Sequence, residues 1–145
     1  MGLNWIYQDK DFTEDMIGED YGFVYIITNL ENNRKYIGKK FFYSLRTKVI
    51  KGKKKRVKLS SDWQSYYGSN DAIKKDVKEL GAEKFKREII HLCKSKGECG
   101  YLEAKEQFAR GVMESDEYYN VWIMVRVRKS HIKDYNARIS ERVEG

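Results

Sequence analysis

The chain has 145 residues, enough for one compact domain, and its 41% hydrophobic and 35% charged content indicates a globular protein with a highly charged surface. A formal net charge of +7 favours a polyanionic partner such as DNA, RNA or an acidic membrane surface, although a merely basic soluble protein has the same balance. No apolar run approaches the ~20 residues that span a bilayer, and the mixed, acidic N-terminus does not have the pattern of a signal peptide. The two cysteines fit no zinc motif, and a reduced cytoplasmic setting is expected.

The first predicted structure is a β-hairpin that follows an irregular, acidic lead-in over residues 1–20. Residues 23–29 and 35–42 are rich in Val, Ile, Tyr and Thr, which suit a pleated strand. The polar stretch LENNR between them favours a turn, because Asn tolerates left-handed geometry. The two runs and the turn together predict the hairpin.

A basic segment, TKVIKGKKKRVK over residues 47–58, follows the hairpin and carries seven Lys or Arg. It lacks a clear helical or strand period, which predicts a mobile loop or a loose ribbon. A solvated loop would need no partner, but the single sign of the charge favours contact with DNA phosphates, which positions a backbone without reading sequence. The cations concerned are Lys48, Lys51, Lys53, Lys54, Lys55, Arg56 and Lys58.

The second half of the chain alternates helices and strands. Asn70 or Asp71 is expected to cap a helix over 71–80, which Gly81 ends. Ahead of it, the aromatic residues of SDWQSYYGSN either stack on bases or form a satellite core. The later elements are a strand over 85–93, a helix over 101–113 with Leu102, Ala109, Val112 and Met113 on its buried side, a strand over 121–128 and a polar, basic tail.

This order, β-β-α-β-α-β, predicts an α+β domain with a small, largely antiparallel sheet and flanking helices. The predicted organisation is a lead-in over 1–20, a domain over 21–120 with the basic insertion 47–58, and a C-terminal strand and basic tail over 121–145.

The hairpin carries two tyrosines, Tyr25 and Tyr36, on opposite strands, and the register can bring both phenols to one face. Gly38 lets a backbone or ligand approach closely. Arg46 follows ten residues after Tyr36. A guanidinium binds anionic phosphate oxygens and a phenol can relay a proton, so this set suits a phosphodiester. The plainer interpretation is that both tyrosines are cross-strand packing residues.

The pattern FVY…YIG at residues 23–25 and 36–38 resembles the two-part signature of the GIY-YIG nuclease superfamily, with Phe23 where the family usually has glycine. The stretches KYIGKK, SDWQSYYGSN and YLEAKEQF…SDEYYN are similar to small free-standing endonucleases of this superfamily that bacteriophages encode. The resemblance covers residues 22–120, and its landmarks occur in the family's order: Tyr25, Tyr36, Arg46, Glu103 and Asn120.

The resemblance implies a role for each landmark. Tyr25 would be the general base, and Tyr36 would position the phosphate or the attacking water. Arg46, on a helix after the hairpin, would stabilise transition-state charge. Glu103 would hold Mg²⁺, for which Mn²⁺ is a possible substitute. Asn120 would be a polar strut near the glutamate, or simply a turn residue.

Several neighbouring residues need separate consideration. Glu106 lies three residues after Glu103 on the same helical face, so either could face the hairpin, but the context of Glu103 fits the family better. Lys39 and Lys40 are expected near the phosphate path. His91, within an apolar strand, is expected to be a satisfied core histidine.

The expected function is a metal-dependent DNA endonuclease. The alternative is a nucleic-acid-binding module on the same scaffold that does not cleave. Because 25 residues follow Asn120, no separate DNA-binding domain is expected after it. The basic insertion and tail, a homodimer or a partner protein would then supply DNA binding. A phage-encoded protein of this kind would act in the cytoplasm of a bacterial host.

Overall fold

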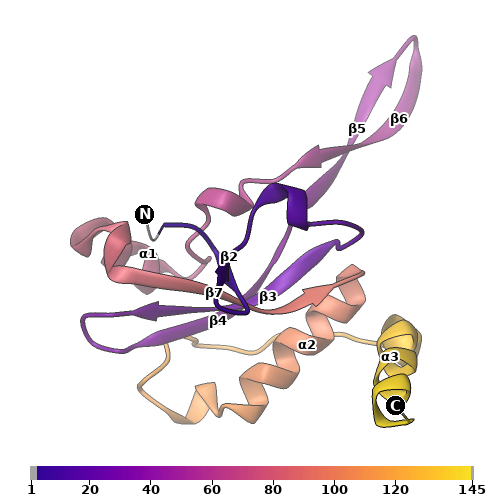
Figure 1. Cartoon of the computed structure of the whole chain (residues 1–145). Helices are drawn as coiled ribbons and strands as arrows, with labels where there is room; N and C mark the ends of the chain where they lie inside the picture. The colour runs from indigo at the N-terminus through magenta and orange to yellow at the C-terminus, as the bar shows by residue number, and fades with distance from the viewer. Residues whose placement is uncertain (1–2, 145) are drawn as a thin grey trace.

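The computed structural model describes residues 3–144 and contains a five-stranded sheet, helices and a separate two-stranded ribbon (Figure 1). The sheet order is β2-β1-β7-β3-β4, and β3 pairs antiparallel with both β4 and β7, while β1 runs parallel to β7. This confirms the predicted α+β class with a largely antiparallel sheet. The strands are β1 (Ile6–Tyr7), β2 (Lys10–Asp11), β3 (Gly22–Asn29), β4 (Lys35–Phe41), β5 (Tyr43–Ile50), β6 (Lys53–Ser60) and β7 (Phe85–Cys93).

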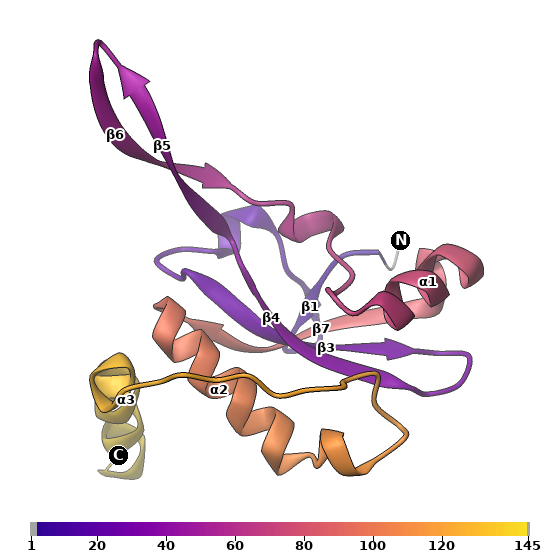
Figure 2. The ribbon, with the colours of Figure 1, turned by 180° about the vertical axis from the view of Figure 1, so that it is seen from behind.

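The helices flank the sheet, with α1 and the N-terminal segment on one side and α2 on the other (Figures 1 and 2). Among the described residues, no helix is both long and apolar enough to cross a membrane. The α-helices are α1 (Asp71–Leu80), α2 (Lys96–Ala109) and α3 (Lys133–Glu144). Short 3₁₀ turns are η1 (Glu14–Met16), η2 (Trp63–Ser65), η3 (Ala82–Lys84), η4 (Val112–Glu114) and η5 (Lys129–Ile132).

The β3–β4 hairpin is the predicted one, and β3 is its buried centre. Every residue of β3 is buried because both faces of the sheet are covered. One face holds an aromatic cluster that includes Phe23, Tyr25 and Trp63. The other face packs Val24, Ile26 and Ile37 against α2. Successive residues of β3 alternate between these two clusters, as a pleated strand requires.

Tyr25 and Tyr36 share the aromatic face, with ring centroids 6.1 Å apart. Tyr25 lies opposite Gly38 in the register of β3 and β4. A Cβ atom at Gly38 would lie 2.7 Å from Cζ of Tyr25 and closer still to its hydroxyl. Gly38 therefore gives the Tyr25 ring the space that a side chain would fill.

The N-terminal segment is not irregular, which corrects the prediction for residues 3–20; residues 1 and 2 lie outside the described part of the chain. It forms β1 and β2 and buries Trp5, Phe12 and Ile17 in the aromatic cluster. The indole of Trp5 donates a hydrogen bond to the carbonyl oxygen of Trp63 at 2.7 Å. The three apolar residues stand far apart among acidic ones and the strands have two residues each, so no sequence period signals them.

The basic segment forms a ribbon, the second of the two predicted alternatives, and it begins earlier than predicted. β5 and β6 pair antiparallel and project away from the sheet (Figures 1 and 2). Lys51 and Gly52 make the turn with φ of 53° and 78°. Two positive φ angles in a two-residue loop are the geometry that matches the twist of a hairpin.

Two other local predictions hold. Asn70 caps α1, because its side-chain oxygen accepts hydrogen bonds from the backbone N–H groups of Ala72 at 2.8 Å and Ile73 at 3.1 Å. The backbone N–H of Gly81 closes the end of α1 by bonding to the carbonyl oxygen of Val77. Trp63 is buried in the aromatic cluster, which favours the core interpretation of the aromatic stretch over base stacking.

The second predicted helix is displaced. α2 starts at Lys96, five residues before the predicted start, because Ser95 caps it through a hydrogen bond from the N–H of Glu98. It ends at Ala109, ahead of Gly111, which adopts φ of 62°. As a result Ala109 and Met113 are exposed rather than buried.

The predicted fourth strand over 121–128 is absent from the described residues. That segment runs extended and unpaired, and Trp122 is 68% exposed. The edge of β4 that a new strand would need is already occupied by residues 117–120. The tail does form helices, η5 and α3, up to residue 144; residue 145 lies outside the described chain.

Replacing Gly38 with alanine tests the close approach of Tyr25. We expect Gly38→Ala to lower the free energy of unfolding by about 1–3 kcal/mol, because the added methyl overlaps the Tyr25 ring. Urea unfolding measures the change. Gly100→Ala is the matched control: its Cβ meets nothing within 4 Å, and alanine within α2 should add about 0.5–1 kcal/mol. Equal effects of the two substitutions would contradict the interpretation.

Candidate active site

The site forms at the outer edge of β4, which has no neighbouring strand within residues 3–144. Residues 117–120 run along this edge. The N–H of Lys35 donates to the carbonyl oxygen of Glu117 at 2.8 Å, and the N–H of Tyr119 donates to the carbonyl oxygen of Lys35 at 2.7 Å. Beyond these two bonds, side chains take over the pairing of the β4 backbone.

Asn120 is the residue that completes this edge. Its side-chain oxygen accepts from the N–H of Ile37 at 3.0 Å, and its amide donates to the carbonyl oxygen of Ile37 at 2.8 Å. Gln107 of α2 donates to the same carbonyl oxygen at 3.0 Å. Buried backbone groups need partners, so Asn120 and Gln107 replace a missing strand. The geometry fits the predicted strut better than a simple turn residue.

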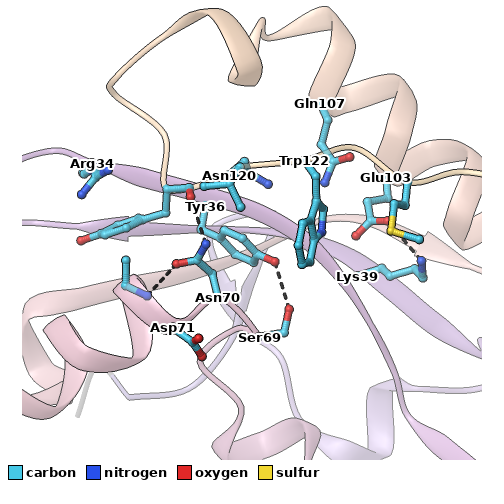
Figure 3. Close-up of a pocket in the computed structure, with 14 residues that line it drawn as sticks. Arg34, Tyr36, Lys39, Ser69, Asn70, Asp71, Glu103, Gln107, Asn120 and Trp122 are labelled. Carbon is cyan, nitrogen blue, oxygen red and sulfur yellow. Dashed lines mark hydrogen bonds and ion pairs between the residues drawn. The ribbon is translucent and has the colours of Figure 1, made fainter.

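A pocket of about 540 Å³ opens beside this edge. Four predicted site residues line it: Tyr36, Lys39, Glu103 and Asn120 (Figure 3). Tyr36 belongs to the aromatic face of β4, whereas Lys39 points to the face that α2 covers. The pocket therefore joins both faces of the sheet around the edge of a single strand.

Tyr36 presents its hydroxyl to the pocket. That hydroxyl lies 3.0 Å from the hydroxyl of Ser69 (Figure 3). Burial raises the pKa of Tyr36 above its ordinary value of 10.0, and the bond with Ser69 partly opposes this. The protein's own groups thus favour the neutral phenol at Tyr36.

Tyr25 is in a different position. It is fully buried, and its hydroxyl has no hydrogen-bond partner in the described part of the chain. Burial raises its pKa well above 10.0, with the phenol of Tyr66 adding to the rise. The structure does not bring the hydroxyl of Tyr25 to the pocket, because the ring lies beneath Gly38.

Glu103 is the acidic group of the pocket that comes from α2. Its carboxylate lies 3.1 Å from the ammonium of Lys39, and its side chain is 14% exposed. Burial raises the pKa of Glu103 above its ordinary value, while the positive charge of Lys39 acts in the opposite direction. The ion pair links the end of β4 to the middle of α2.

Glu106, the alternative, lies outside the pocket lining. It bonds to His91 at 2.8 Å and to Arg110 at 3.0 Å, and these bonds lower its pKa although burial opposes them. The structure thus brings Glu103, and not Glu106, to Tyr36. His91 has a hydrogen-bond partner, as a satisfied histidine should, but its side chain is 31% exposed, so the prediction of a core histidine is wrong.

The structure does not place Arg46 at this site. Arg46 lies on β5 opposite Val57, with an exposed side chain, rather than on a helix, because the chain leaves β4 into the ribbon. The arginine that lines the pocket is Arg34, whose guanidinium lies 4.4 Å from the ring centroid of Tyr119. Nothing in the LENNR turn distinguishes Arg34 as a site residue in the sequence.

The other predicted cations divide between two places. Lys39 lines the pocket, whereas Lys40 points to the opposite face, where it pairs with Asp62 at 2.6 Å and lies over the ring of Tyr66. The ribbon carries the rest, all exposed: Lys48, Lys51, Lys53, Lys54, Lys55, Arg56 and Lys58.

The sequence interpretation missed some of the pocket residues. Ser69 and Asn70 precede α1, and Trp122 and Met124 come from the extended segment after Asn120. Ser69 and Asn70 lie in YYGSN, a stretch whose sequence predicts a helix cap and an aromatic cluster but no pocket residue. Trp122 carries no signal, since its segment looked like an ordinary strand.

The donor groups of the pocket limit how a metal ion can bind. Among the side chains that the structure describes, those of residues 3–140, no group of three or more His, Cys, Asp or Glu gathers. Mg²⁺ is commonly held by one or two carboxylates, with waters and substrate phosphate oxygens completing its shell. Two carboxylates line the pocket, Glu103 from α2 and Asp71 from the first turn of α1, and the pocket is open to a substrate, which fits that mode of binding.

Comparisons with known proteins identify the family of the chain. A family model described as "Putative endonuclease segE, GIY-YIG domain" matches residues 5–123. The chain therefore belongs to the GIY-YIG nuclease superfamily, in the segE-type family. It is 32% identical over 101 residues to "Putative endonuclease segE" of Enterobacteria phage T4, which confirms the predicted resemblance to bacteriophage-encoded members.

The match to the T4 protein covers 70% of this chain but about 40% of the length of that relative. The chain therefore spans less than half of the length of that relative. No solved structure matches the chain closely enough to count as similar.

Replacing Asn120 with alanine tests its role at the β4 edge. We expect Asn120→Ala to lower the free energy of unfolding by about 1–3 kcal/mol, because the buried N–H of Ile37 loses its partner. Asn136→Ala is the control, since Asn136 is exposed on α3 and should change stability by about 0.5 kcal/mol or less. Urea unfolding of both variants decides the matter, and similar losses would argue against a strut.

Proposed function

We propose that this chain is a metal-dependent endonuclease that hydrolyses phosphodiester bonds of DNA, with the pocket at the edge of β4 as its active site. The observation that carries the proposal is the convergence of Tyr36, Lys39, Glu103 and Asn120 on one pocket in a chain of a nuclease family. Belonging to that family supports a nucleic acid as the substrate. The basic ribbon supports duplex DNA as its form.

Glu103 would hold the divalent ion, Mg²⁺ or Mn²⁺. When bound, the ion would offset phosphate charge and stabilise the leaving 3′ oxygen. Lys39 has two tasks in this proposal. In the free protein its ammonium balances the carboxylate of Glu103 at 3.1 Å, and with substrate present it turns toward a phosphate oxygen.

Tyr36 is the phenol that meets the substrate in this proposal, because its hydroxyl lines the pocket. It would orient the phosphate or the attacking water, with Ser69 fixing the direction of its hydroxyl at 3.0 Å. A base role for a tyrosine requires a lowered pKa, and burial acts in the opposite sense on both Tyr25 and Tyr36. The proposal therefore gives Tyr25 a packing task, and it places Arg34 rather than Arg46 beside the phosphate.

The proposal also covers the cellular location of the protein and the source of its DNA specificity. The protein would act in the cytoplasm of a bacterial host, as the phage relative suggests. DNA specificity would come from the ribbon, or from a homodimer or partner protein. A non-cleaving nucleic-acid-binding module stays the alternative, because Arg46 does not lie at the pocket.

A supercoiled-plasmid assay tests the proposal. With Mg²⁺ we expect nicking or linearisation that EDTA abolishes. Glu103→Gln should lower the rate by about 100-fold or more, because the carboxylate that holds the ion is lost. Glu106→Gln is the matched control and should retain activity, since Glu106 is engaged with His91 and Arg110.

The reverse result, with Glu106→Gln inactive and Glu103→Gln active, would move the metal ligand to Glu106. Plasmid binding without cleavage in either Mg²⁺ or Mn²⁺ would favour the binding module.

The pH dependence of cleavage tests the pair of Lys39 and Glu103. Glu103 must be ionised to take up the metal ion, so kcat/KM, which reports the free enzyme, should fall as pH drops through a pKa that burial holds above the ordinary 4.5. Lys39→Met removes the charge that favours the carboxylate, which raises that pKa further. We therefore expect the acid limb of kcat/KM against pH to move to higher pH. Lys94→Met removes a remote charge paired with Asp20 and should leave the limb in place.

A shift of the acid limb toward lower pH, or an equal shift in both variants, would show that the ion pair of Lys39 and Glu103 does not set the position of that limb.

A further inference from the structure

The ribbon of β5 and β6 concentrates the positive charge of the whole chain. Residues 43–60 hold eight Lys or Arg and no Asp or Glu, and without these eight cations the net charge of +7 would be −1. Within the described chain the ribbon strands pair only with each other, so no other element covers them. A surface of this kind is built for a polyanion rather than for packing.

The cations occupy both faces of the ribbon. Residues directly opposite in an antiparallel pair share a face, and the register places Lys48 opposite Lys55 and Thr47 opposite Arg56. One face therefore carries Arg46, Lys48, Lys53 and Lys55. The other face carries Lys54, Arg56 and Lys58.

This distribution costs stability in the free protein. Like charges directly opposite across two strands destabilise the pair, as with Lys48 and Lys55. No carboxylate within the ribbon offsets them. Phosphates close to both faces would balance all of these cations, whereas a partner that touches one face would leave the cations of the other face without counter-charge.

We propose that the ribbon inserts into the major groove of duplex DNA, with its two cationic faces serving phosphates on both walls of the groove. This inference rests on the proposed DNA substrate. The major groove, about 12 Å wide, admits a two-stranded β-ribbon. A ribbon lying along the outside of the duplex would need charge on one face alone.

Other features of the ribbon suit a groove. Val49 is 69% exposed and Ile50 40% exposed near the turn, where they face no apolar partner of the sheet among the described residues. Apolar side chains at such a tip can contact the methyl groups of thymine. Within residues 3–144 the outer edges of β5 and β6 also pair with no further strand, so their backbone N–H groups are additional donors for phosphate oxygens.

The ribbon is a direct continuation of the strand that carries the pocket. β4 ends at Phe41 and β5 begins at Tyr43, and the N–H of Ser61 closes the base by donating to the carbonyl oxygen of Phe42 at 2.8 Å. Eight strand residues extend about 26 Å. One turn of DNA spans about 34–36 Å, so the ribbon is long enough to follow a groove for most of one turn from its base.

Two charge-matched variants test the inference. One removes three cations from one face, Lys48→Gln with Lys53→Gln and Lys55→Gln. The other removes three from the opposite face, Lys54→Gln with Arg56→Gln and Lys58→Gln. The control removes three exposed lysines of α1, Lys74→Gln with Lys75→Gln and Lys78→Gln. All are made in a Glu103→Gln background, so that binding to a duplex oligonucleotide is measured without cleavage.

We expect each ribbon variant to weaken binding about ten-fold or more near 0.1 M salt. The slope of log K against log salt should become shallower by about 0.9 for each phosphate that the variant no longer neutralises. The control should bind as the background does. Methyl green, which occupies the major groove, should displace the protein, and netropsin, which occupies the minor groove, should not.

Weaker binding for one face alone, or displacement by netropsin instead of methyl green, would overturn the groove assignment. Binding of both ribbon variants equal to the control would remove the ribbon from the DNA interface. Cleavage by the wild type is scored separately. A wild type that binds in this pattern but never cuts defeats the proposed nuclease and leaves the groove inference standing, and a wild type that cuts while the ribbon variants bind normally does the reverse.

Discussion

The open edge of β4 is the constraint on which the site depends. The backbone groups of Ile37 are buried and have no strand beside them in the described chain, so Asn120 and Gln107 must supply their partners. Gln107 meets Ile37, and Glu103, four residues earlier on α2, meets Lys39, two residues later on β4. Four helical residues rise about 6 Å and two strand residues about 6.6 Å, so the two contacts are commensurate. Closing the strand edge therefore also sets the position of the carboxylate.

The same edge explains why Tyr36 and Glu103 can share a pocket although they approach from opposite faces of the sheet. If β4 were an interior strand, the next strand of the sheet would lie between the side chains of Tyr36 and Glu103. At an edge, the side chains of both faces meet around the backbone, and residues 117–120 leave room beside Tyr36 (Figure 3). The proposed active site thus depends on one unpaired strand edge. The aromatic core beneath Gly38 keeps that strand close to β3.

Local signals predicted the parts of the fold that local chemistry decides. The hairpin, the cap at Asn70 and the strand over 85–93 all follow from short-range patterns. Other parts depend on what else is nearby in space. The segment 121–128 has the composition of a strand, but the edge it would join is already satisfied. The first strands are too short to show a period. Ser95 starts α2 ahead of Gly97 and Gly100, and glycine is unfavourable inside a helix, so the sequence does not show this early start.

The candidate site divides in the same way. Tyr36, Glu103 and Asn120 were placed by order along the chain, and the structure gathers them because the β4 edge needs them or their neighbours. Arg46 was assigned to the site because it follows Tyr36 by ten residues, but those residues lead into the ribbon, where Arg46 lies on β5. Arg34 reaches the pocket from a turn whose sequence suggests only a change of direction. Spacing along a chain predicts proximity only while the intervening element is the expected one.

The backbone hydrogen bond between Phe42 and Ser61 has a consequence for how such a protein can diversify. It joins the two ends of the ribbon to each other at the margin of the sheet, and among the described residues of the ribbon Tyr43 is the one that packs against the aromatic cluster. Lengthening, shortening or recoding residues 43–60 leaves the aromatic core nearly untouched, since the buried residues of that cluster lie outside this stretch. Under the proposed function, target preference can then change independently of the pocket at the β4 edge, and related proteins can keep one reaction centre while exchanging the segment that would contact the DNA.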